Sequence, residues 1–185
     1  MKRIASILVI FLTAFSMGSC EDDDPIAVDP LNLFLGSGTG MASVGSNDFI
    51  LDKGIVFDYG ANGDGLFNFD IQLVSGNLSL GLDGLNGRGS NLTLELNTET
   101  QDGIQDGTYT YGTDPSVNRS LTDAQFAGDY DFSLDNGFGF VDVEGGTVNV
   151  IRVDDTYNIT FDLVLVTGEF LTGSYAGTLT TFTED

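Results

Sequence analysis

The sequence is dominated by runs in which apolar and polar residues alternate, and this pattern decides what the chain can fold into. The clearest run is 66–74, LFNFDIQLV, in which every second residue is apolar. The same spacing recurs in 91–98, NLTLELNT, and in 157–166, YNITFDLVLV. A period of two residues is typical of strands that bury one face, and no stretch sustains a helical period. The chain is therefore predicted to be all-β.

Short polar and glycine-rich segments connect the alternating runs, among them GANGDG at 60–65 and DDT at 154–156. Such connections are typical of hairpins, and short connections make neighbouring strands antiparallel. We expect an antiparallel meander of about eight to ten strands that closes as a lipocalin-like barrel or a two-layer sandwich. Two longer connections are expected at 75–90 and 113–128, the second with one helical turn starting at Ser120.

The N-terminus has the composition of a secretory signal peptide. Lys2 and Arg3 precede an apolar run at 4–15, and small residues follow at 16–19. The run is shorter than the roughly 20 apolar residues that span a bilayer. We predict that 1–19 is removed as a signal peptide.

The only cysteine follows this leader directly. Met17-Gly18-Ser19-Cys20 resembles the lipobox of bacterial lipoproteins, with Met and Gly in place of the commoner Leu and Ala or Ser. The resemblance implies that Cys20 receives a diacylglycerol and becomes the first residue of the mature chain. Two or three acyl chains hold a protein on a membrane durably, whereas one binds reversibly. The alternative is an ordinary signal peptide that discards Cys20 or leaves its thiol free.

Four acids follow the cysteine, namely Glu21, Asp22, Asp23 and Asp24. They resemble the export signal of Bacteroidota surface lipoproteins, which implies an outer-membrane location facing the cell exterior. The alternative is a solvated spacer, because like charges repel each other and stay wet. Residues 20–30 are then a lipidated, acidic, flexible tether, and 31–185 form a single β-domain, a size that sustains one core.

The second half of the chain resembles a recurring pattern of uncharacterised Bacteroidota lipoproteins. The matching segments are GTY at 107–109, GGTV at 145–148, ITFDL at 159–163 and GSYAGTL at 173–179. These are mostly turn and core residues, so the resemblance implies a β-fold and carries no activity with it.

Charge and composition exclude several classes of function. The chain has 6 Lys and Arg against 28 Asp and Glu, a formal charge of −22, and it has no histidine or tryptophan. Nucleic-acid binding needs a basic surface, and histidine-based catalysis and metal binding need imidazoles. A partner is expected to be neutral or cationic.

Oxygen-rich side chains gather in one predicted turn, at Asp58, Asn62 and Asp64. Calcium takes six to eight oxygen ligands, so this turn is a candidate calcium site, without the distal Glu of an EF-hand. Asp, Asn and Gly are also the residues that a hairpin turn favours for its backbone angles.

Carboxylates and aromatic rings supply the remaining candidates. Asp129 with Asp131 and Asp142 with Glu144 are pairs that glycoside hydrolysis can use, although exposed strand faces carry such pairs by chance. Six aromatic residues are candidates to line a ligand pocket or to fill the core: Tyr109, Tyr111, Tyr130, Phe132, Phe138 and Phe140.

Together these features predict a lipid-anchored surface protein whose role is binding rather than catalysis. The expected ligand is a glycan, a small apolar molecule or another surface protein. The alternatives are a carboxylate-dependent glycoside hydrolase and a structural or accessory subunit of an outer-membrane complex. No cofactor is expected apart from the candidate calcium ion.

Overall fold

The computed structural model describes residues 35–81, 84–134 and 139–183, and these ranges contain strands, turns and loops but no helix. The strands are β1 (Gly36–Val44), β2 (Asn47–Ile50), β3 (Lys53–Ala61), β4 (Phe67–Val74), β5 (Ser79–Gly81), β6 (Gly84–Asn86), β7 (Arg88–Thr98), β8 (Gly107–Tyr111), β9 (Ser120–Asp131), β10 (Val141–Val153), β11 (Thr156–Leu165), β12 (Phe170–Gly177) and β13 (Thr180–Thr183). The predicted all-β class is confirmed. The described strands outnumber the expectation because β2, β5, β6 and β13 are too short to show an alternating pattern.

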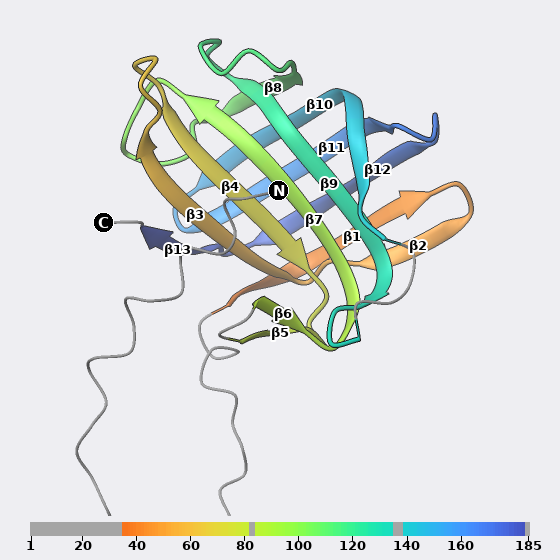
Figure 1. Cartoon of the computed structure of the whole chain (residues 1–185). Helices are drawn as coiled ribbons and strands as arrows, with labels where there is room; N and C mark the ends of the chain where they lie inside the picture. Colours follow the sequence, from red (N-terminus) through yellow and green to blue (C-terminus); the bar gives the residue numbers. More distant parts are fainter. Residues whose placement is uncertain (1–34, 82–83, 135–138, 184–185) are drawn as a thin grey trace, which may run out of the picture.

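Eleven of the strands form one sheet, and its hydrogen bonds make a closed ring (Figure 1). The ring runs β3-β4-β7-β9-β10-β11-β12-β1 and returns to β3 through the pairing of β1 with β3. β8 fits between β9 and β10, while β2 and β13 lie beside the ring strands β1 and β3. A separate two-stranded sheet, β5 with β6, lies within the predicted long connection at 75–90, whose last three residues belong to β7.

Most neighbouring strands are antiparallel, as expected, and the connections explain this. The end of β3 and the β3–β4 connection carry Gly60, Gly63 and Gly65 at φ of 70°, 82° and 85°, a left-handed conformation that favours glycine. The exceptions are β8 with β9 and β13 with β3, which pair in parallel. The predicted helical turn at Ser120 is wrong, because Ser120 is the first residue of β9 and is paired with Asn97 of β7 and Thr110 of β8.

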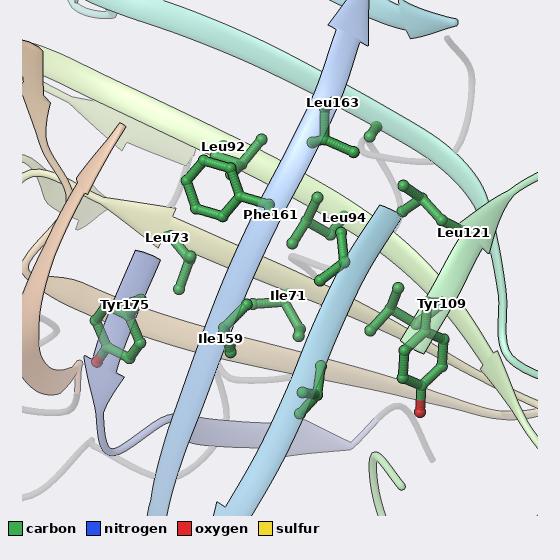
Figure 2. Packing of buried hydrophobic residues seen from close by; sticks show 14 of the residues in the cluster. Ile71, Leu73, Leu92, Leu94, Tyr109, Leu121, Ile159, Phe161, Leu163 and Tyr175 are labelled. Carbon is green, nitrogen blue, oxygen red and sulfur yellow. The ribbon is translucent and has the colours of Figure 1, made fainter. Parts of the chain in front are cut away.

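Apolar side chains from all sides of the ring fill its interior (Figure 2). Phe69, Ile71 and Leu73 of β4 are almost completely buried, as the alternation predicts. So are the inward residues of β7 and β11, namely Leu92, Leu94, Leu96, Tyr157, Ile159, Phe161, Leu163 and Leu165. Each fully buried aliphatic or aromatic side chain contributes roughly 1.5–3 kcal/mol relative to exposure, so this cluster is the main source of stability.

A second apolar cluster lies on the outer face of β3 and β4. Its buried members are Leu35, Ile55, Val74 and Leu78, and the partly buried ones packed on them are Phe57, Leu85, Phe132 and Phe182. The rings of Phe57 and Phe182 stack on this face with centroids 5.7 Å apart. This contact stabilises the pairing of β13 with the edge of β3.

The ring closes at a short seam between β1 and β3. β1 pairs with β3 through only two residue pairs, Gly36 with Gly54 and Ser37 with Lys53. Beyond them the same edge of β3 is taken by β13, whose Thr180–Thr183 pairs with Ile55–Asp58. The intervening residues 178–179 therefore cross from β12 to β3, and Leu179 packs directly onto Gly54. This seam positions the site described next.

Candidate functional site

A cavity of about 370 Å³ opens beside the seam, where β3 has diverged from β1. Five segments form it: β3, β4, residues 101–104, the β10–β11 turn and the crossing at 178–181. Its lining residues are Val56, Asp58, Phe69, Gln101, Asp102, Gly103, Ile104, Arg152, Asp155, Tyr157, Thr178, Leu179 and Thr181. We call this cavity the seam pocket. A volume in this range is typical of sites for small molecules.

The floor of the seam pocket is apolar and continues into the main core. Val56, Phe69, Ile104 and Tyr157 belong to the central cluster, and each is at most 7% exposed. Leu179 packs against the same cluster from the crossing segment. Since the four core side chains are almost completely buried, the partly exposed Leu179 is the apolar lining residue most accessible to a ligand.

The crossing segment is itself fixed by hydrogen bonds. The Tyr175 hydroxyl donates to the Thr178 carbonyl oxygen at 2.7 Å, and the Thr178 amide donates to the Ser37 carbonyl oxygen at 3.1 Å. The Ser37 amide in turn donates to the Thr178 hydroxyl at 3.1 Å. These bonds hold one wall of the pocket to β1 and β12.

Charged side chains surround the mouth of the pocket, and three of the four are acids: Asp58, Asp102 and Asp155. The fourth is Arg152, whose guanidinium carbon lies 5.2 Å from the centre of the Tyr157 ring. Its Nε donates to the Asp154 carbonyl oxygen at 2.9 Å, and its Nη2 lies 3.9 Å from Asp155 Oδ1. Arg152 is thus already engaged by neighbouring groups, and the mouth carries an excess of negative charge.

The predicted calcium turn is held together by its own side chains. Asp58 Oδ1 accepts a hydrogen bond from the Gly60 amide at 2.8 Å, and Asn62 Oδ1 accepts one from the Asp64 amide at 3.0 Å. Asn62 Nδ2 donates to Asn97 Oδ1 at 3.1 Å, which ties the turn to β7. Within the described ranges no group of three or more acidic, histidine or cysteine residues is arranged to hold a metal ion. Calcium binding here stays a prediction.

The five candidate aromatic residues that the structure describes lie in two places. Tyr109 is fully buried in the main core, its hydroxyl donates to the Gln105 carbonyl oxygen at 2.8 Å, and burial raises its pKa to about 12. Tyr111 packs partly against the same core. Tyr130, Phe132 and Phe140 pack on one another, with ring centroids 5.0–5.9 Å apart. Phe138 lies outside the described residues. None of the described five is among the residues that line the seam pocket.

The predicted carboxylate pairs lie on exposed surface and have local partners. Asp129 forms a two-pronged salt bridge with Arg88, with both N–O distances 2.9 Å. Asp131 Oδ1 accepts hydrogen bonds from the next turn, from the Ser133 amide at 3.1 Å. Asp142 accepts one from Gln125 at 2.7 Å, and Glu144 is exposed two residues further along β10.

A different row of carboxylates stands out, and sequence reasoning missed it. Asp70, Glu95 and Asp123 are opposite one another on β4, β7 and β9, on the outer face of the sheet. Burial, reinforced by the charge of Glu95, raises the pKa of Asp70 to about 7. The Tyr59 hydroxyl donates to Asp70 Oδ2 at 3.3 Å, and Glu95 Oε1 accepts from Thr122 Oγ1 at 2.9 Å. Alternation alone places these side chains outward, but the register that brings them together is not local.

Cys20 and the acids Glu21, Asp22, Asp23 and Asp24 lie outside the described residues, as does the leader. The signal peptide, the lipidation and the export signal stay predictions. Within the ranges that the structure describes, no helix has the length and apolarity to cross a membrane.

Comparisons with known proteins identify no relative of this chain. No family model matches the chain, no curated protein matches it, and no solved structure matches its fold.

Proposed function

We propose that the protein is a lipid-anchored binding module of the cell surface and that its ligand occupies the seam pocket. The anchor part of the proposal is supported by the leader, by Cys20 in its lipobox-like setting and by the four acids after it. The binding part is supported by the pocket, which combines an apolar floor with polar and charged side chains from five segments.

The pocket is the observation that carries this function. The interior of the ring is occupied by packed side chains, so a ligand is received at the rim rather than deep inside. The rim offers carboxylates, the hydroxyls of Thr178 and Thr181 and the amide of Gln101 around an apolar base. A concave site lined by both polar and apolar groups is a candidate for binding a small molecule.

Filling the pocket tests this function directly. Thr181 is exposed on β13 and lines the pocket, so Thr181→Trp places a large ring in the mouth. Thr183→Trp is the matched control, because Thr183 is exposed two residues along the same strand and does not line the pocket. Small amines, saccharides and apolar compounds are screened by thermal shift and confirmed by calorimetry. The ligand found should bind the control normally and Thr181→Trp at least about tenfold more weakly. Equal binding to both variants places the ligand elsewhere and contradicts the proposal.

A second candidate, glycoside hydrolysis, is favoured by Asp70 and Glu95. The two carboxyl groups face each other from adjacent strands, and the raised pKa of Asp70 keeps part of it protonated near neutral pH. A pair of carboxyl groups, one of which holds its proton near neutral pH, is the arrangement that this reaction uses. Hydrolysis of aryl glycosides by the wild type and its loss in both Asp70→Asn and Glu95→Gln would favour this candidate over a binding role.

A further inference from the structure

The charges at the mouth of the seam pocket are unbalanced, and this bears on the ligand that the proposed binding function requires. Asp58, Asp102 and Asp155 face a single cation, Arg152. Asp155 is the only one of the three acids that lies within 4.0 Å of a described cationic group, at 3.9 Å from Arg152. Asp58 and Asp102 therefore offer carboxylate oxygens that no described Lys or Arg neutralises.

The remaining contacts of these two acids leave them available. One oxygen of Asp58, Oδ1, accepts the Gly60 amide at 2.8 Å. Asp102 is held by its backbone, whose amide donates to Thr100 Oγ1 at 2.9 Å, rather than by its carboxylate. Their positions are thus set by the backbone while at least one oxygen of each remains free for a ligand in the described structure.

Arg152 is poorly suited to be the ligand-binding charge. Its guanidinium stacks 5.2 Å from the Tyr157 ring centre, its Nε bonds the Asp154 carbonyl oxygen, and Asp155 lies beside it. The positive charge of Arg152 is therefore already compensated by groups of the same hairpin. An anionic ligand would also have to approach a chain whose formal charge is −22.

The apolar lining of the seam pocket adds a second condition on the ligand. Below the charged mouth lies Leu179, which packs on the buried core, is itself partly exposed and offers apolar surface to a hydrocarbon segment. Aliphatic ammonium groups combine these two properties, because their methylene stem packs on apolar side chains while the charged end stays among carboxylates.

From this arrangement we infer that the seam pocket recognises an aliphatic primary ammonium, such as a lysine side chain or a free alkylamine. The inference rests on the proposed function and specifies its ligand class. The carboxylates of Asp58 and Asp102 bind the ammonium group, and the apolar floor binds the chain that carries it. The overall acidity of the protein concentrates such ligands at the mouth.

Capped amino acids give matched probes for this inference. Nα-acetyl-lysine methylamide carries the ammonium, the norleucine analogue has the same stem without charge, and the glutamate analogue carries the opposite charge. Calorimetry with the full mature chain should show that the lysine probe binds at least about tenfold more tightly than the norleucine probe. Pentylamine serves as the free-amine probe, so its affinity relative to the lysine probe distinguishes a free amine from a peptide-borne one.

Charge-removing variants locate the interaction. Asp58→Asn/Asp102→Asn retains an acceptor for the Gly60 amide and should weaken the lysine probe about tenfold. Asp64→Asn is the control, because its exposed carboxylate lies in the neighbouring turn outside the pocket, and it should change the affinity less than about twofold. Raising the salt concentration should weaken the lysine probe and leave the norleucine probe unaffected.

The outcomes separate the two proposals. If the norleucine or glutamate probe binds as tightly as the lysine probe, and Thr181→Trp abolishes that binding, the pocket stands and the ammonium inference is overturned. If the lysine probe binds Thr181→Trp as well as the wild type, the pocket itself is the wrong site. If no probe carrying an ammonium binds at millimolar concentration, the inference is likewise overturned.

Discussion

Asp70 of β4 and Glu95 of β7 lie directly opposite each other on adjacent antiparallel strands, and neither carboxylate pairs with a described Lys or Arg. Two like charges at opposed positions destabilise a sheet, and here one of them is also largely removed from water. Burial and the charge of Glu95 therefore raise the pKa of Asp70 to about 7. The consequence is a dependence of stability on pH that can be measured.

The sign of this dependence follows from the two states of Asp70. Below its ordinary pKa of 3.8 the group is protonated in the folded and the unfolded chain, so it has no effect. Between 3.8 and about 7 the unfolded chain loses the proton while the folded chain keeps it, so stability falls as pH rises. Asp70→Asn should therefore stabilise the protein at pH 8 by about 2–4 kcal/mol and have little effect at pH 4, measured by urea unfolding. A gain that is the same at both pH values would contradict this origin.

Gly173 of β12 is expected to tolerate no larger residue. A Cβ at this position would overlap the Met41 carbonyl oxygen and the end of the Phe161 ring, which are fixed by the sheet and the core. Gly173→Ala should lower the free energy of unfolding by about 2–4 kcal/mol, because backbone and core must both shift. Gly112→Ala is the control, since no atom lies within 4 Å of the added carbon, and it should cost less than about 1 kcal/mol.

Replacing the lipidated residue tests the anchor. Cys20→Ala removes the thiol that the acyl group is predicted to occupy, so the exported protein should move from the membrane fraction to the soluble fraction. The control is Ser19→Ala, which changes the neighbouring residue and leaves the thiol in place. Persistence of the Cys20→Ala protein in washed membranes would show that something other than acyl chains holds it.

The acidic segment gives a separate prediction about location. Replacing Asp22, Asp23 and Asp24 together with Ala should reduce cleavage of the protein by protease added to whole cells, because fewer molecules reach the outer face. Membrane attachment itself should persist, since Cys20 is unchanged. Undiminished cleavage would mean that the acids serve as a spacer and not as an export signal.

The strands were predictable where a local pattern encodes them, and β4 and β1 show the contrast. Predicted strand 66–74 agrees with β4 to within one residue, because the apolar Phe67, Phe69, Ile71 and Leu73 alternate with the polar Asn68, Asp70 and Gln72. β1, GSGTGMASV, has no such pattern, yet it pairs with β12 over seven residues. Its glycines are required by close approach, since a Cβ at Gly38 or Gly40 would meet backbone of β12. Such a requirement becomes visible only in the folded chain.

The site was not predictable for the same reason. Val56 and Thr181 are far apart in the sequence, and they share a pocket only because β13 returns to the edge of β3. The aromatic candidates had a local signal, aromatic residues among glycines, that does not distinguish Tyr109 in the main core from the separate ring cluster of Tyr130 with Phe132. Likewise the opposition of Asp70 and Glu95 depends on strand register, which the hydrophobic pattern of either strand leaves open.

The seam has a consequence for how the protein is made. Gly38 of the first strand lies opposite Gly177 of the twelfth, and the last strand pairs with β3 beside this seam. A nascent chain lacking these final residues has no means of completing its structure, and contacts of such long sequence separation form slowly. The ring of strands can therefore close only after β12 has been synthesised, so the domain completes its fold late in its own synthesis.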